Sequence, residues 1–183
     1  MYGKQFEEGP IATSYIPTSG STVARAAETL IVPSTNVPET TAGTSIVLKA
    51  LLTYADTNSS TEAYFVFWQD SAANEILIRL ITTDFRTGQI RVAHDSGTQV
   101  VVNSAEDAYS PGINVPFSIA SYHTSSVFGV VTNGTFGEED TIAGMPDLGG
   151  TDIILGQVFN GFISELRVFA TSIGQAGGEE VTS

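Results

Sequence analysis

Short runs of apolar and β-branched residues, separated by turn residues, dominate the chain. Nine such runs fill residues 45–54, 64–68, 75–82, 89–94, 98–102, 117–123, 127–132, 152–155 and 162–169. Asp95-Ser96-Gly97 and Thr124-Ser125-Ser126 lie between consecutive runs, and Asn133-Gly134 follows one; each of the three segments predicts a turn. Short strands with turn signals at this spacing are typical of an antiparallel β-sandwich or barrel.

Three segments give more specific predictions of local structure. The run 64–68 is apolar throughout, which predicts a strand covered on both faces. Glu138-Glu139-Asp140 follows a glycine-containing turn and predicts a solvated loop. In the run 162–169, strict alternation places Ile163 on the same face as Glu165, Arg167 and Phe169.

Helix signals are scarce, and the first part of the chain differs in character. Residues 172–183 predict at most one helical turn, because they contain three glycines. Residues 1–32 predict an extended arm or accessory strand region, and residues 33–44, rich in Thr, Ser and Pro, predict a linker. Residues 45–183 then form the sandwich. Such an arm either pairs with a neighbouring subunit or forms an outer strand of its own domain.

Charge and composition exclude several classes of function. The chain has 7 Lys and Arg against 20 Asp and Glu, for a net charge of −13. Binding to nucleic acid is disfavoured, because basic residues supply most of that affinity. No run approaches the ~20 apolar residues of a membrane span, and the first residues lack the apolar core of a signal peptide. The absence of Cys excludes thiolate catalysis and disulfides.

One segment near the start resembles a known family. Residues 5–28 read QFEEGPIATSYIPTSGSTVARAAE, which resembles a segment that recurs in bacteriophage tail and virion structural proteins. In that family the segment precedes a jelly roll. The resemblance implies a component of the virion, at the particle surface on the tail or the capsid.

A second resemblance covers the end of the apolar pattern. Residues 152–169 resemble the closing strands of laminin-G-like, concanavalin A-like domains, and residues 117–134 resemble the hairpin before them. The resemblance implies an all-β, antiparallel jelly-roll sandwich with an extended N-terminal arm. It also implies that calcium can bind at a loop edge, as in many laminin-G-like domains.

The residues give no support for catalysis. The chain lacks the E-x-D-x-x-E pattern of paired carboxylates that related glycosidases carry on one strand. It also lacks a G-x-S-x-G nucleophile elbow. His94 and His123 each end a predicted strand, and two histidines without Cys make a tight zinc site unfavourable. The prediction is therefore a protein that is not an enzyme and requires no cofactor.

Candidate binding residues come from aromatic side chains and acidic loops. The predicted ligand-binding residues are Trp68, Tyr122 and His94, and Tyr54 and Tyr109 are weaker candidates. The alternative for Trp68 is a buried position in the core. Oxygen ligands in loops suit calcium. The candidates for that site are Asp56, Asn58, Asp70 and Asn74, with Glu75 beside them.

The sequence thus predicts a non-catalytic bacteriophage virion protein of the tail-fibre or appendage type. Its jelly roll would bind a host-surface glycan or other virion proteins, without nucleic acid and without membrane insertion. The chain is expected to form a homo-oligomer, and the analogy with tail appendages suggests a trimer. The alternatives are a capsid decoration protein without sugar affinity and, less favoured, a glycan depolymerase.

Overall fold

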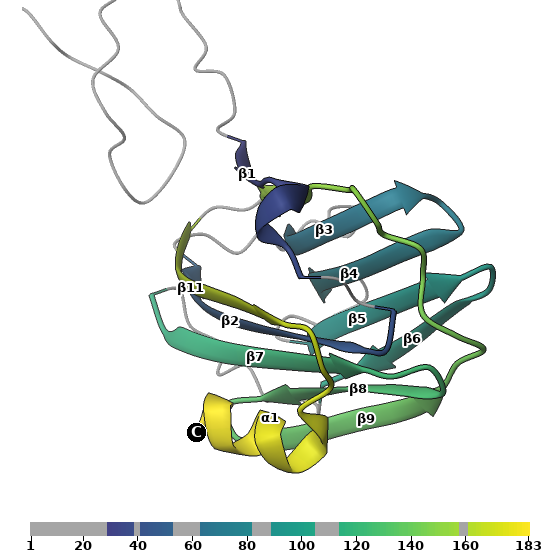
Figure 1. Cartoon of the computed structure of the whole chain (residues 1–183). Helices are drawn as coiled ribbons and strands as arrows, with labels where there is room; N and C mark the ends of the chain where they lie inside the picture. Colours follow the sequence, from purple (N-terminus) through teal and green to yellow (C-terminus); the bar gives the residue numbers. More distant parts are fainter. Residues whose placement is uncertain (1–28, 39–40, 53–62, 82–88, 105–113, 158–160) are drawn as a thin grey trace, which may run out of the picture.

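Two antiparallel sheets make up the molecule (Figure 1). The computed structural model describes residues 29–38, 41–52, 63–81, 89–104, 114–157 and 161–183. The elements are β1 (Leu30–Val32), η1 (Ser34–Asn36), β2 (Thr44–Leu52), β3 (Ala63–Ser71), β4 (Asn74–Ile81), β5 (Gln89–Ser96), β6 (Gln99–Asn103), β7 (Pro116–His123), β8 (Val127–Thr132), β9 (Thr135–Thr141), β10 (Ile153–Gln157), β11 (Gly161–Phe169) and α1 (Gly174–Thr182).

The strand order is that of a jelly-roll sandwich. One sheet has six strands in the order β1-β10-β3-β4-β5-β6, and the other has five in the order β11-β2-β7-β8-β9. Every pairing is antiparallel. All nine strands predicted from the apolar runs are present, so the predicted fold class is confirmed.

The core lies between the two sheets and follows from alternation along the strands. Ile76, Ile78 and Leu80 of β4 point inward at every second position and are at most 2% exposed. Trp68, Phe65 and Phe128 are the largest fully buried rings of this core. Burying aromatic and aliphatic side chains in this way contributes roughly 1.5–3 kcal/mol for each, which outweighs the weak intrinsic preferences of the strands.

Two strands, β1 and β9, lie outside the nine apolar runs, and β1 falls within the predicted arm or accessory strand region. β1 lies at the end of the predicted arm, where it pairs with β10 and packs Val32 against the core; residues 1–28 lie outside the described residues. β9 contains Glu138-Glu139-Asp140, so the prediction of a solvated loop there is wrong. β9 is an edge strand with mostly exposed side chains, and charges on an edge strand discourage pairing with other chains.

The strand β11 departs from strict alternation. Its register against β2 shifts between Ile163 and Glu165, so Ser164 is an extra residue at a bulge. Ile163 therefore packs on the core side with Leu166 and Val168. The prediction that Ile163 shares a face with Glu165 is wrong, because the bulge reverses the alternation after that position.

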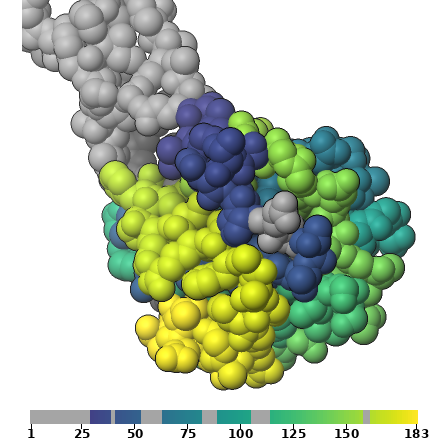
Figure 2. All heavy atoms as spheres, viewed as in Figure 1, coloured from purple at the N-terminus to yellow at the C-terminus, as the bar shows by residue number. Residues whose placement is uncertain are grey.

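The helix α1 is longer than the single turn predicted. Gly178 lies against β7 and β8, where a Cβ would come within 2.8 Å of Val131 Cγ2, so a small residue permits close docking. Val131, Ala120 and Val47 form the apolar cluster beneath the helix. In Figure 2 the yellow-green atoms of β11 and the yellow atoms of α1 form one continuous surface. Within the described residues, no helix has the length and apolar character needed to cross a membrane.

Candidate functional site

The three residues predicted to contact a ligand are all buried. Trp68 is 2% exposed and donates from Nε1 to the carbonyl of Thr151 at 3.2 Å. Tyr122 is 2% exposed, and its hydroxyl donates to Glu139 Oε2 at 2.7 Å. His94 is fully buried. These side chains hold the sandwich together and offer no exposed ring face to a sugar, so they do not form a ligand-binding surface.

His94 and His123 form a hydrogen-bonded pair between the two sheets. Their Nδ1 atoms are 3.0 Å apart, and their rings stack on each other and lie against Phe128. His94 Nε2 is 2.9 Å from the carbonyl of Gly144, and His123 Nε2 is 3.2 Å from Ser121 Oγ. Burial lowers the pKa of His94 and of His123, so both rings are neutral near pH 7.

The predicted calcium ligands do not come together in the described residues. Asp56 and Asn58 lie outside those residues. Asp70 is exposed near the end of β3, whereas Asn74 Oδ1 accepts a hydrogen bond from the backbone N–H of Asp147 at 3.0 Å. Among the described residues no group of three or more His, Asp and Glu could hold a metal ion. The calcium site therefore stays a prediction from the sequence.

A different surface, the outer face of the six-stranded sheet, has the features of a binding site. The register of the strands places an unbroken line of apolar residues across all six of them, one per strand. This apolar row consists of Ile31, Ile154, Phe67, Leu77, Ala93 and Val101. Ile31 is 48% exposed, and Phe67, Ile154 and Val101 are partly exposed, whereas Leu77 and Ala93 are buried, at 4% and 0% exposure. The outer face of an antiparallel sheet is ordinarily polar, so an apolar row indicates a surface that contacts something.

A second line of residues, the arginine row, lies beside the apolar row. It consists of Tyr64, Arg79, Arg91 and Asn103, which are directly opposite one another on β3, β4, β5 and β6. The Tyr64 ring packs edge-on against Phe67 with centroids 5.7 Å apart, which joins the two rows. The Arg79 guanidinium carbon lies 5.9 Å from the centre of the Tyr64 ring.

The polar row lies on the other side of the apolar row. It consists of Gln69, Glu75, Asp95 and Gln99 on the same four strands. Glu75 is 4% exposed and accepts hydrogen bonds from Gln69 Nε2 at 2.5 Å and from Gln99 Nε2 at 2.6 Å. The two amides stabilise the buried carboxylate and fix the orientation of the row.

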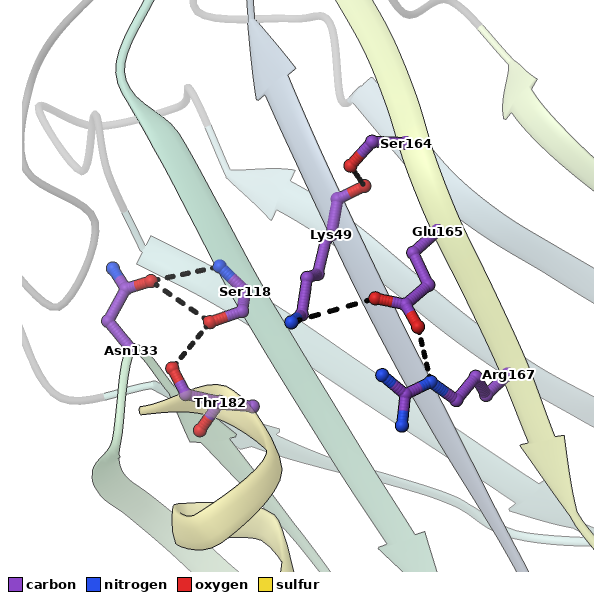
Figure 3. Close-up of polar contacts among 7 residues, drawn as sticks. All are labelled: Lys49, Ser118, Asn133, Ser164, Glu165, Arg167 and Thr182. Carbon is purple, nitrogen blue, oxygen red and sulfur yellow. Dashed lines mark hydrogen bonds and ion pairs between the residues drawn. The ribbon is translucent and has the colours of Figure 1, made fainter.

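The outer face of the five-stranded sheet is different, because its polar groups bind one another (Figure 3). Glu165 lies between Lys49, at 3.6 Å, and Arg167, which donates to it from Nε. The hydrogen bond from Arg167 is the main reason that the pKa of Glu165 is lowered. The Ser118 hydroxyl is also used within the protein, because it donates to the carbonyl of Thr182 at 2.6 Å. The helix α1 covers much of the apolar remainder of this face.

Sequence reasoning missed the residues of the six-stranded face, although one signal was present. The apolar run at 64–68 includes Tyr64 and Phe67, which point outward and are only partly buried, so the prediction of a strand covered on both faces is wrong. The available clue to an apolar outer face was the run 64–68, because a core requires an apolar residue only at the inward positions of a strand. Arg79 and Arg91 could not be paired from sequence, because their alignment depends on the register between β4 and β5.

Comparison with known proteins shows the fold alone. No protein-family model matches the chain, and no curated protein is similar to it at a significant level. Among solved structures, the sialidase module "Ruminococcus gnavus IT-sialidase CBM40 bound to alpha2,3 sialyllactose" has a TM-score of 0.60 at 12% identity, covering 78% of this chain and 83% of its own.

Two further structures are similar over part of their length. The receptor-binding domain of botulinum neurotoxin C/D mosaic serotype has a TM-score of 0.63 at 13% identity, over 84% of this chain and 39% of its own. The leech intramolecular trans-sialidase has a TM-score of 0.59 at 14% identity, over 78% of this chain and 23% of its own. The chain thus spans less than half the length of these two proteins, and the likeness confirms the jelly-roll sandwich fold.

Proposed function

We propose that this chain is a non-catalytic glycan-binding domain whose ligand lies on the outer face of the six-stranded sheet. The observation that carries the proposal is the apolar row, which runs across all six strands with polar side chains on both sides. The names of two similar structures, a CBM40 module with sialyllactose and a receptor-binding domain, support binding rather than catalysis as the role of this fold.

The three rows match the surface of a sugar. A pyranose ring has a C–H face that packs on apolar and aromatic groups, and a rim of hydroxyl groups that forms hydrogen bonds. Phe67 and Tyr64 supply adjacent rings, and Asn103, Gln69 and Gln99 supply amides on either side. Residues two apart along a strand are about 6.6 Å apart, so the three rows span about 13 Å, enough for a short oligosaccharide.

Glu75 and Asp95 raise the question of hydrolysis, because they are directly opposite each other on β4 and β5. A glycosidase needs one carboxylic acid that gives a proton to the leaving oxygen. Glu75 instead accepts amide hydrogen bonds at both of its oxygens, and Asp95 Oδ1 accepts the backbone N–H of Gly97 at 2.8 Å. These contacts already occupy both oxygens of Glu75 and one oxygen of Asp95, and the proposal therefore predicts no release of new reducing ends from any bound polysaccharide.

The proposal is tested on a glycan array followed by titration of the best ligand. Phe67→Ala removes the central ring of the apolar row and is expected to weaken binding roughly tenfold, or about 1.4 kcal/mol. Phe162→Ala is the matched control, because Phe162 is 63% exposed on β11 of the other sheet. Absence of any glycan ligand, or equal losses in the two variants, would overturn the proposal.

A second candidate function is contact with other proteins of a bacteriophage particle. The aliphatic members of the apolar row, Ile31, Ile154 and Val101, suit a protein partner as well as a sugar. The resemblance of residues 5–28 to virion proteins supports this setting, although that segment lies outside the described residues. Mass spectrometry of purified particles tests it: the chain is expected among the particle proteins, and its absence would remove the candidate.

A further inference from the structure

The two ends of the five-stranded sheet carry charges of opposite sign. β11 forms one end and β9 the other, with β2, β7 and β8 between them (Figure 1). Within the described residues, each of these two strands has only one neighbouring strand in this sheet. Edge strands are the parts of a sheet that another chain reaches most directly. The side chains at the two ends therefore decide what the sheet can contact.

The end at β11 is positively charged. Lys49 of β2 and Arg167 of β11 are two of the four basic residues among those that the structure describes, and their side chains are 42% and 46% exposed. Glu165 lies between them and binds both (Figure 3). One anion between two cations leaves this group positive, although the whole chain has a net charge of −13. We call Lys49, Glu165 and Arg167 the basic edge.

An exposed aromatic ring lies beside the basic edge. Phe162 of β11 is 63% exposed, and the partly exposed Leu51 of β2 is directly opposite it. Leu51 is two residues along β2 from Lys49, so both point to the outer face of the sheet. Aromatic residues and Arg are enriched in protein–protein interfaces. The composition of this end therefore suits contact with a protein.

The end at β9 is negatively charged. Glu138, Glu139 and Asp140 follow one another on β9 and are exposed, and the helix α1, which packs on β9, adds Glu179. Burial is the largest cause that raises the pKa of Tyr122, and a hydrogen bond to Glu139 and the charges of Glu139 and Glu179 raise it further. We call these four acidic residues the acidic edge.

We propose that the basic edge of one copy of this chain binds the acidic edge of a second copy. The opposite signs make this contact attractive, whereas two acidic edges repel each other. Such a contact joins side chains and needs no hydrogen bonds between strands, so it agrees with the protection of β9 against strand pairing. The proposal concerns assembly of the chain and is independent of the proposed glycan binding.

A contact between two different edges determines how copies assemble. Two copies joined in this way still leave one basic edge and one acidic edge unoccupied. Further copies therefore add until a ring closes, whereas a symmetric dimer requires contact between identical surfaces. The expected assembly is a ring of three or more chains. Because the contact depends on charge, salt weakens it.

Sedimentation of the full chain at two salt concentrations tests the proposal. At about 50 mM salt the mass is expected to be that of three or more chains, and at about 500 mM salt it is expected to fall toward that of one chain. A single chain at both salt concentrations, or a dimer of the unmodified chain, would overturn the proposal. If three or more chains stay together at both concentrations, variants decide whether the two edges are responsible.

Two variants, each with one altered edge, give the sharper test. Arg167→Glu reverses a charge of the basic edge and Asp140→Lys one of the acidic edge, so each variant alone is expected to be a monomer. An equimolar mixture is expected to form a complex of two chains, because each variant keeps the edge that the other has lost. Asp70→Lys is the control, because it changes the net charge as Asp140→Lys does but lies on β3 of the other sheet. This control is expected to assemble as the unmodified chain does.

The outcomes distinguish this contact from other modes of assembly. Assembly of Arg167→Glu or Asp140→Lys alone, no complex in their mixture, or a monomeric Asp70→Lys would each overturn the proposal. All three substituted residues are exposed, and thermal unfolding checks that each variant is folded. If a variant fails to unfold cooperatively, Lys49→Glu takes the place of Arg167→Glu, and Glu138→Lys that of Asp140→Lys.

Discussion

At the residue scale, the paired histidines have a single consistent arrangement of protons. A carbonyl oxygen only accepts, so His94 Nε2 carries a proton and donates to Gly144. His94 Nδ1 must then accept from His123 Nδ1, and His123 Nε2 accepts from the Ser121 hydroxyl. A proton added to His94 would go to Nδ1 and face the Nδ1–H of His123, so that two donors would meet between the sheets. A proton added to His123 would go to Nε2, and the Ser121 hydroxyl would have to turn from donor to acceptor.

The pair therefore makes the stability of the protein depend on pH. Burial is the largest cause that lowers both pKa values below the ordinary 6.5; Asp95 acts in the opposite direction on His94. Below pH 6.5 the unfolded chain takes up protons that the folded chain refuses, so the free energy of unfolding falls as pH falls. The stabilisation is complete above that pH and is lost progressively toward the lowered pKa values.

Urea unfolding at about pH 7.5 and about pH 5.5 measures this effect, with an expected loss of about 2 kcal/mol at the lower pH. The chain has only two histidines, and carboxyl groups in an unfolded chain titrate near pH 4, so this interval isolates the pair. An unchanged free energy of unfolding, or an imidazole NMR signal that titrates near pH 6.5, would contradict the account.

Gly129 makes a second prediction at this scale. It is directly opposite Tyr122, and a Cβ at Gly129 would lie 2.5 Å from the ring carbon Cζ. Gly129→Ala is expected to cost about 1–3 kcal/mol of stability by overpacking, measured by thermal unfolding. Gly149→Ala serves as the control, because the nearest atom to its Cβ would be 3.5 Å away, at Asp147 Oδ1. Equal stability of the two variants would show that the Tyr122 ring moves aside.

Sequence reasoning found large side chains at this scale but not their surroundings. Trp68, Tyr122 and His94 were predicted from residue type, and all three are buried, because aromatic groups bury the most apolar area in a core. Exposure depends on which neighbours the strand register brings together. That register is set by pairing across long sequence separations and cannot be read from one segment.

At the scale of elements, the helix α1 is held by the side chain of its last helical residue. Thr182 Oγ1 donates to the carbonyl of Gly178 at 2.7 Å and accepts the backbone N–H of Gly134 at 3.0 Å. The contact ties the helix to the turn between β8 and β9, where Asn133 and Gly134 have φ of 48° and 73°. Tertiary contacts thus outweigh the poor helix propensity of the glycines.

Replacement of Thr182 tests this contact. Thr182→Val keeps the shape of the side chain and removes the hydroxyl, which leaves the Gly134 N–H without that acceptor. We expect a loss of about 1–3 kcal/mol in the free energy of unfolding, measured with denaturant. Glu180→Gln, at an exposed position on the same helix, is expected to change it by less than about 0.5 kcal/mol. A loss in both variants would point to helix propensity instead.

The elements themselves show what a sequence pattern predicts well. Nine strands followed from apolar runs and turn residues, because inward positions must be apolar at every second residue. β9 was missed because its exposed edge carries Glu138-Glu139-Asp140 and little apolar signal. The bulge at Ser164 was missed because an inserted residue leaves the composition of β11 unchanged while it reverses the faces after it.

At the scale of the whole molecule, the two outer faces of the sandwich differ in what they leave exposed. The five-stranded sheet is covered by α1, and its ion pairs join its own residues, Lys49, Glu165 and Arg167. The six-stranded sheet presents the apolar row between two polar rows. A binding function predicts such an asymmetry, because only one face has to remain available.

NMR titration of the ¹⁵N-labelled chain tests whether a glycan binds the outer face of the six-stranded sheet. The ligand is the glycan selected on the array, and the backbone amide shifts report which strands it contacts. We expect the largest shifts on β3, β4, β5 and β6, centred on Phe67 and Arg91. Shifts centred on β2, β7 and α1, or none at saturating ligand, would contradict this expectation.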